Sequence, residues 1–122
     1  MESKKILLVD DADTVLMIEK MILKKNYDLV IAKNGEEAIT SALSERPDLI
    51  LLDVVMPKMD GFEACKRIRH EPTTSCIPII MVTTRGEEHN IETAYASGCN
   101  DFVSKPINGL ELLSKVKNYL DQ

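Results

Sequence analysis

Short runs of apolar residues alternate with longer amphipathic segments along the whole chain. Three runs, at residues 6–9, 49–52 and 79–82, are apolar at every position and lack the alternation of a strand with one face in water. Such runs predict strands in the middle of a parallel sheet that helices cover on both faces. Two weaker runs, at residues 29–32 and 102–103, predict strands at the edges of that sheet.

Helical periodicity fills the intervals between these runs. Apolar residues recur there every three or four positions, the spacing that places them on one face of a helix. In the first helix this buried stripe is expected to consist of Val15, Ile18 and Ile22. Helices are therefore predicted at residues 12–25, 35–45, 61–69, 87–97 and 108–120.

The predicted order is a strand followed by a helix, five times over. Repeating units of this kind form a parallel sheet with right-handed crossovers and helices on both faces. A chain of 122 residues has the size of one domain, so we expect a single doubly wound α/β domain over residues 1–122. The expected strand order is 2-1-3-4-5, as in flavodoxin-like folds.

Composition and charge narrow the classes of function. Fifteen Lys and Arg against twenty Asp and Glu give a net charge of −5 without a basic patch, which argues against direct nucleic-acid binding. No apolar stretch has the length of a membrane-spanning helix, and the N-terminal apolar run is too short for a signal peptide. Cys65, Cys76 and Cys99 form no C-x-x-C pair and are expected as free thiols. We therefore expect a cytoplasmic protein with no membrane insertion.

Polar side chains gather where the predicted strands end. In a parallel α/β sheet the carboxyl ends of the strands form the edge at which functional groups lie. Carboxylates follow the first and third strands, hydroxyl groups end the fourth, and an ammonium group follows the fifth. The residues expected at this edge are Asp10, Asp11, Asp53, Thr83, Thr84 and Lys105.

The chemistry of these groups points to phosphoryl transfer. Three carboxylates in one pocket repel one another unless a cation neutralises them, and oxygen ligands with room for water suit Mg²⁺. A strand-end carboxylate beside Mg²⁺ and a lysine can attack a phosphoryl group and form an aspartyl phosphate. The cation, the lysine and a threonine hydroxyl would then stabilise the charge on the phosphoryl oxygens.

Four motifs at this edge resemble those of the receiver domains of two-component response regulators, the chemotaxis regulators among them. The motifs are Ile6–Asp11 (ILLVDD), Leu51–Gly61 (LLDVVMPKMDG), Val82–Thr83 and Ser104–Pro106 (SKP). Each is weak alone, but all four in this order and at these spacings are highly specific. The resemblance covers the chain from Lys5 to about Leu120. It implies a signalling domain that catalyses only its own phosphorylation and dephosphorylation.

The resemblance also implies roles for single residues. Asp53 corresponds to the phosphoacceptor and, together with Asp11, to a direct Mg²⁺ ligand. Asp10 would hold a metal-bound water, and the backbone carbonyl of Val55 would complete the ligands from the protein. Lys105 corresponds to the lysine that pairs with the phosphoryl group.

The resemblance implies a second set of roles, for residues that transmit the signal. Thr83 corresponds to the hydroxyl that turns toward the phosphoryl group, and Phe102 to the aromatic ring that changes position with it. The surface of the fourth helix, fifth strand and fifth helix would change as a result. The implied donor is a sensor histidine kinase or a phosphotransfer protein. The implied recipient of the signal is a downstream protein or an output domain.

Pro106 has a counterpart in this family, whereas Thr84 and Val55 depart from its commonest pattern. Pro106 corresponds to a cis-proline, a form that X-Pro bonds adopt far more readily than other peptide bonds do. Thr84 stands where a small residue is usual, which would narrow access to the phosphoryl group. Val55 offers no polar side chain beside the acyl phosphate, so it would neither orient nor repel a hydrolytic water.

An alternative assignment starts from residues 11–15 (DADTV), which fit the D-x-D-x-[TV] motif of haloacid-dehalogenase-type phosphatases. In those enzymes the first Asp attacks and the second is the general acid, so Asp11 and Asp13 would take these roles. That assignment leaves Asp53 and the motif around it unexplained, and 122 residues leave no room for the usual cap. A flavin-binding electron carrier is a poorer alternative, because two aspartates after the first strand would repel the flavin phosphate.

The first helix leaves one further question open. Leu16 and Met17 lie beside its expected buried stripe, near the edge that carries the carboxylates. This apolar shoulder is compatible with docking of a partner and equally with packing at the periphery of the core.

Overall fold

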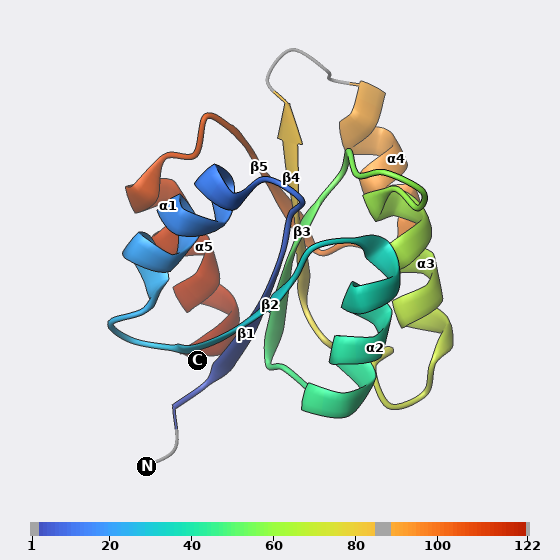
Figure 1. Ribbon diagram of the computed structural model, residues 1–122, viewed down its shortest axis with the longest axis horizontal. Helices are drawn as coiled ribbons and strands as arrows, with labels where there is room; N and C mark the ends of the chain where they lie inside the picture. Colours follow the sequence, from blue (N-terminus) through green and yellow to red (C-terminus); the bar gives the residue numbers. More distant parts are fainter. Residues whose placement is uncertain (1–2, 85–88, 122) are drawn as a thin grey trace.

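The computed structural model describes residues 3–84 and 89–121, which form one parallel sheet with helices on both faces (Figure 1). The strand order β2-β1-β3-β4-β5 is the predicted one, with β2 and β5 at the edges. The helix expected at residues 87–97 begins outside the described residues, because residues 87 and 88 do not belong to them. The strands are β1 (Lys5–Val9), β2 (Asp28–Ala32), β3 (Leu49–Asp53), β4 (Ile79–Thr84) and β5 (Asp101–Lys105).

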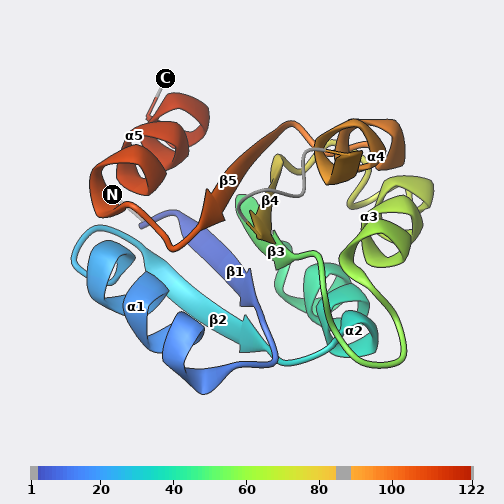
Figure 2. The same cartoon turned by 90° about the horizontal axis from the view of Figure 1, so that it is seen from above.

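Two layers of helices cover the sheet. Helices α1 (Asp13–Leu23) and α5 (Gly109–Leu120) lie on one face. Helices α2 (Gly35–Glu45), α3 (Gly61–His70) and α4 (His89–Ser97) lie on the other, as the view from above shows (Figure 2). No helix in the described part of the chain is long and apolar enough to cross a membrane.

The alternation of side chains along each strand divides the core in two. In β1, Ile6 and Leu8 pack in the cluster beneath α1 and α5, whereas Leu7 and Val9 pack in the cluster beneath α2, α3 and α4. The central strands are buried on both faces, which explains why their sequences are apolar at every position.

Side-chain caps begin three of the helices at the expected kind of residue. The Asn108 side chain accepts a hydrogen bond from Glu111 N at 3.0 Å, which confirms the predicted start of α5. Asn34 and Asp60 cap α2 and α3 in the same way. Gly98 follows α4 with a φ of 109°, so a glycine ends this helix as predicted.

The buried stripe of α1 differs from the prediction. Its buried residues are Leu16, Glu19 and Leu23, whereas Ile18 is 46% exposed. The other two members of the predicted stripe are half-buried. The prediction was wrong because the true stripe contains a carboxyl group, and a pattern built from apolar residues alone excludes it. Leu16 is thus core, which settles its half of the open question on the apolar shoulder.

Candidate functional site

The carboxyl ends of β1, β3 and β5 bring two carboxylates and one ammonium group together. Asp10 follows the last residue of β1, Asp53 ends β3, and Lys105 ends β5. Lys105 Nζ lies 3.1 Å from Asp53 Oδ1 and 3.4 Å from Asp10 Oδ2. Both aspartates are buried, while the side chain of Lys105 keeps 27% of its exposure. The ammonium group therefore bridges two buried carboxylates from neighbouring strands.

Asp11 completes an acidic cluster at this edge. One carboxylate oxygen each from Asp10, Asp11 and Asp53 lie within 4.8 Å of one another. Asp10 Oδ1 accepts a hydrogen bond from Ala12 N at 2.9 Å, and Asp10 Oδ2 has no hydrogen-bond partner among the described residues. A single lysine cannot balance three carboxylates. This set of hard oxygen donors, one of them exposed and one without a hydrogen bond, fits a small divalent cation such as Mg²⁺.

Burial and crowding alter the protonation of the two groups at the centre of the cluster. Burial, followed by the charge of Asp10, raises the pKa of Asp53 to about 6, although the hydrogen bond from Lys105 acts in the opposite direction. Burial disfavours the charged form of Lys105, but its hydrogen bond to Asp53 and the nearby carboxylate charges raise its pKa. At neutral pH Asp53 is therefore mainly ionised and can act as a nucleophile.

The loop after β3 holds Asp53 through a close backbone contact. Gly61, the first residue of α3, lies against the end of β3, and a Cβ at this position would meet Asp53 O at 2.2 Å. Gly61 N also donates a hydrogen bond to Val54 O at 2.8 Å. Asp60 caps α3 just before this contact. The Asp60–Gly61 pair in the second motif is thus explained by the way the loop closes on the end of β3.

Three further residues singled out from the sequence lie at the same edge of the sheet. Val55 lies in the loop between β3 and α3, two residues after Asp53, with an exposed side chain. Thr84 ends β4 and is exposed at the same edge of the sheet. The Lys105–Pro106 peptide bond is cis, as the resemblance implied.

Thr83 and Phe102 lie on neighbouring strands, β4 and β5. The Thr83 hydroxyl is buried and donates a hydrogen bond to Val103 O at 3.4 Å. The Phe102 ring packs edge-on against Tyr95 of α4, with ring centroids 6.2 Å apart. In this structure the hydroxyl is thus bonded to the backbone of β5, and the ring lies against α4.

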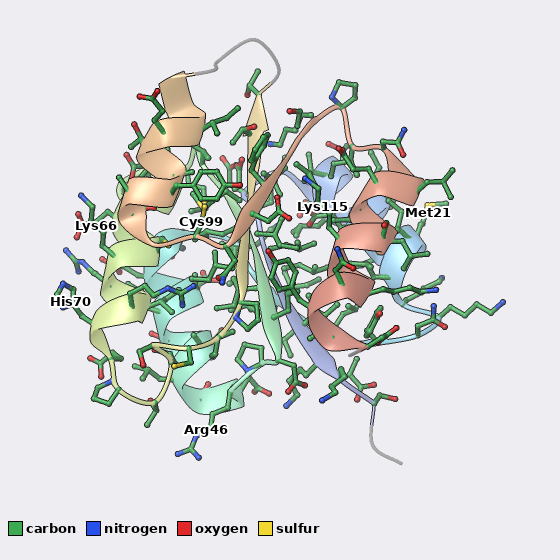
Figure 3. All side chains as sticks on the ribbon, turned by 180° about the vertical axis from the view of Figure 1, so that it is seen from behind. Met21, Arg46, Lys66, His70, Cys99 and Lys115 are labelled. Carbon is green, nitrogen blue, oxygen red and sulfur yellow. The ribbon has the colours of Figure 1, made fainter. Side chains whose placement is uncertain are left out.

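Lys115 of α5 contacts the same aromatic residue. Its Nζ lies 5.0 Å from the centroid of the Phe102 ring, 2.6 Å from Phe102 O and 3.1 Å from Asp101 Oδ1. Figure 3 labels this residue on α5. Because β5 is an edge strand, side chains from both helical layers reach Phe102. The ring is therefore held between Tyr95 and an ammonium group.

A comparison of sequences decides the family. The profile of the response regulator receiver domain matches residues 6–117. The chain belongs to the response regulator receiver domain family. Phosphorylation on aspartate and binding of Mg²⁺ are typical of this family. The predicted resemblance is thereby confirmed, and so is the predicted fold.

The proteins similar to this receiver domain include transcriptional regulators and a chemotaxis protein. The alkaline phosphatase synthesis transcriptional regulatory protein PhoP of Bacillus subtilis (strain 168) is 39% identical over 119 residues, which cover 97% of this chain and 49% of that protein. The chain spans about half the length of this relative. The structure of chemotaxis protein CheY4 of Vibrio cholerae matches 98% of this chain and 100% of that one, at a TM-score of 0.91 and 32% identity.

A third similar structure contains a metal ion. The receiver domain of sensor histidine kinase PA1611 from Pseudomonas aeruginosa PAO1 matches with a TM-score of 0.91 and 28% identity, over 99% of this chain and 100% of that one. In that structure a magnesium ion is coordinated in the active site cleft. The acidic cluster of this receiver domain thus has the composition expected of a magnesium-binding family.

Sequence reasoning missed Glu19, which lies in the core of the receiver domain beneath the site. Its side chain is 1% exposed, and burial, followed by the charge of Asp10, raises its pKa to about 8. The signal that could have found it is the spacing of a lone acid between Leu16 and Leu23, three and four residues away on the same helical face.

Helix α1 exposes several large apolar side chains. Met17, Ile18 and Met21 are exposed, and Figure 3 labels Met21 at the surface. Of the two residues in the predicted shoulder, only Met17 thus remains available to a partner.

Proposed function

We propose that this receiver domain accepts a phosphoryl group on Asp53 from a sensor histidine kinase or a phosphotransfer protein, and passes the signal to another protein or domain. The observation that carries this proposal is the position of Asp53 between Lys105 and the other two carboxylates at the end of a central strand. We take residues 1–122 as one such domain. The chain spans about half the length of the regulator PhoP that it matches, which supports an output partner.

The chemistry follows from the groups around Asp53. A carboxylate oxygen attacks the phosphorus of a phosphohistidine, the bond from phosphorus to nitrogen breaks, and its electron pair stays on the imidazole ring. Lys105, now 3.1 Å from Asp53, is placed to pair with a phosphoryl oxygen instead. Thr84 at the end of β4 lies at the same edge and is the second group from the protein that we assign to the phosphoryl group.

Mg²⁺ is the cofactor in this proposal. Asp10, Asp11 and Asp53 would hold it together with the carbonyl group of Val55, Asp10 through a water. Bound there, the cation would neutralise the carboxylates and the developing charge on the phosphoryl oxygens. The protein supplies the rest by holding Asp53 still, through the contact with Gly61, and by excluding water from its buried side.

The phosphatase assignment of residues 11–15 finds less support. Asp13, its general acid, is the first residue of α1, has a side chain that is 79% exposed, and forms an ion pair with Lys33. The hydrogen bond from Lys33 lowers the pKa of Asp13, whereas a general acid needs a raised one.

Output in this proposal uses the surface of α4, β5 and α5. A phosphoryl group on the acceptor would attract the Thr83 hydroxyl away from Val103 O, because its oxygens are strong charged acceptors. The space beside Phe102 would change, and the ring could leave its position between Tyr95 and Lys115.

A cytoplasmic location is the last part of the proposal. The structure contains Cys65, Cys76 and Cys99 as free thiols. Free thiols fit a reducing compartment.

Labelling with a small phosphodonor tests the acceptor. Acetyl phosphate with Mg²⁺ should label the wild type and Asp13→Asn, and it should not label Asp53→Asn. Asp13→Asn is the matched control, because it removes an equivalent carboxylate from the exposed start of α1. Label that survives in Asp53→Asn and disappears in Asp11→Asn would establish the phosphatase-type assignment instead.

A further inference from the structure

Glu19 is a buried carboxyl group that the phosphoryl chemistry does not use. Neither of its oxygens has a hydrogen-bond partner in residues 3–84 and 89–121. A buried carboxyl group normally pairs with a cation or accepts hydrogen bonds, because its ionised form loses several kcal/mol of hydration. Leucine occupies the neighbouring positions of the same stripe, Leu16 and Leu23, so an apolar residue would suit the packing here. A group that opposes local stability in this way calls for a role.

Apolar side chains surround Glu19 on most sides. Helix α1 packs against β1, β2 and α5. The side chains that β2 and α5 contribute to this cluster include Leu29, Ile31, Leu112 and Val116, none of which can carry charge. Those elements therefore offer Glu19 no counter-charge within the cluster.

The charges that act on Glu19 belong to the phosphorylation site. They are the carboxylates of Asp10 and Asp53, which disfavour its ionisation, and the ammonium group of Lys105, which favours it. Alternation along the strands explains this link. The three site residues each lie two positions after a member of the core cluster beneath α1 and α5, namely Leu8, Leu51 and Val103, and so face the same side of the sheet.

A divalent cation at the site would reverse the balance of charge at Glu19. Without a cation, burial and the neighbouring carboxylates raise its pKa to about 8, so the group is mainly protonated at neutral pH. Two positive charges beside Asp10 and Asp53 would attract the ionised form across an interior of low dielectric. By thermodynamic reciprocity, a carboxylate that the cation stabilises must strengthen cation binding by the same factor.

We propose that Glu19 is a residue of the divalent-cation site that acts through its charge rather than by coordination, so that the cation and the Glu19 carboxylate stabilise each other. The proposal deepens the function proposed above and rests on its cation site. Glu19 is a positioning residue in this role, since it touches neither the cation nor the phosphoryl group.

Isothermal titration calorimetry with Mg²⁺ at about pH 7, in two buffers of different protonation enthalpy, tests the coupling. The wild type should release a substantial fraction of one proton on binding. Glu19→Gln should release a much smaller fraction, because it lacks the proton that the wild type gives up from Glu19. Glu19→Gln and Glu19→Leu should both bind Mg²⁺ about fivefold more weakly or worse. Glu71→Gln, which removes a carboxylate from the exposed end of α3, should behave as the wild type.

Thermal unfolding supplies a readout that guards against a folding defect. Glu19→Leu should unfold at a higher temperature than the wild type without Mg²⁺, because it removes a buried carboxyl group. The rise in melting temperature on addition of Mg²⁺ should be smaller in this variant. If Glu19 had only a structural role, Glu19→Leu would change the melting temperature without Mg²⁺. The rise in melting temperature on addition of Mg²⁺ and the proton release would then stay as in the wild type.

Two outcomes would overturn the proposal, and only the second would also contradict the cation site. If the wild type and Glu19→Gln bind Mg²⁺ with equal affinity and equal proton release, Glu19 is not coupled to the cation, while the cation site itself stands. If the wild type binds Mg²⁺ no better than Asp11→Asn does, both the cation site and the role of Glu19 are wrong.

Discussion

The metal-free protein should lose stability as the pH rises from about 5 to about 8. Glu19 has a pKa of about 8 in the folded state, against an ordinary value of 4.5 for a glutamate side chain in water. Between these values the folded protein holds a proton that the unfolded chain has released. The free energy of unfolding therefore falls by about 1.4 kcal/mol per pH unit in this window. For most carboxyl groups the native state favours the ionised form, which gives the opposite sign.

The size of the effect follows from the same values. Integrated from about pH 5 to about pH 8, the single group removes roughly 3 to 4 kcal/mol. Asp53, with a pKa of about 6, adds to the loss in the lower part of the window. Lys105 contributes no slope here, because the pKa of a lysine lies far above this window and the fold raises it further, so the group is protonated in both states. A domain of this size has about 5–15 kcal/mol in total, so the loss is a large share.

Urea unfolding followed by circular dichroism, in the presence of EDTA and at several pH values, measures this loss. A change of 3 kcal/mol corresponds to a shift in the urea midpoint of about 1 M or more. Glu19→Leu should show a much flatter profile, and Glu71→Gln should follow the wild type. If the wild type is as stable at about pH 8 as at about pH 5, or if Glu19→Leu keeps the full slope, the assignment of a buried protonated Glu19 is wrong.

Three other substitutions test the loop and the switch. Gly61→Ala should lower the free energy of unfolding in urea by about 1–3 kcal/mol. Gly109→Ala should be tolerated, because a Cβ there meets nothing closer than 3.6 Å. An equal loss of stability in both variants would contradict the close contact at Gly61. Thr83→Ala should still be phosphorylated but lose most of the change in partner affinity that beryllofluoride induces, and a wild-type change would exclude this route. Lys115→Met should release the Phe102 ring and bring the partner affinity of the unphosphorylated protein closer to that of the phosphorylated protein. Lys115→Arg keeps the positive charge and should not have this effect. If the partner affinity is unchanged in both variants, Lys115 takes no part in the switch.

The central strands could be predicted from the sequence almost to the residue. Residues 49–52 and 79–82 are apolar because both faces of their strands are buried, and the structure extends these strands only to Asp53 and Thr84. The edge strand β5 was predicted only at residues 102–103, although it runs over Asp101–Lys105. Its remaining residues are polar because one side of an edge strand lacks a neighbour and its end carries site residues.

The site residues at the ends of the strands could also be predicted from the sequence. The residues of α1 and α5 that interact with the site or with Phe102 could not. The place of Asp10, Asp53 and Lys105 follows from topology alone, because parallel strands end at one edge. The roles of Glu19 and Lys115 depend on how α1 and α5 are rotated against the sheet, and tertiary packing decides that rotation.

In the proposed output route, the signal has to cross the sheet. Asp53 and Lys105 face the side of α1 and α5, together with Glu19 and the core cluster beneath those helices. Phe102 packs with the opposite cluster, against α4. The Thr83 hydroxyl connects the two sides. Thr83 lies near the end of β4, the strand between β3 and β5, and its hydroxyl donates a hydrogen bond to Val103 O. The Val103 side chain belongs to the cluster beneath α1 and α5. In the proposed route, a phosphoryl group on Asp53 would break this hydrogen bond and allow the Phe102 ring to change position, which would carry the change to the surface of α4, β5 and α5.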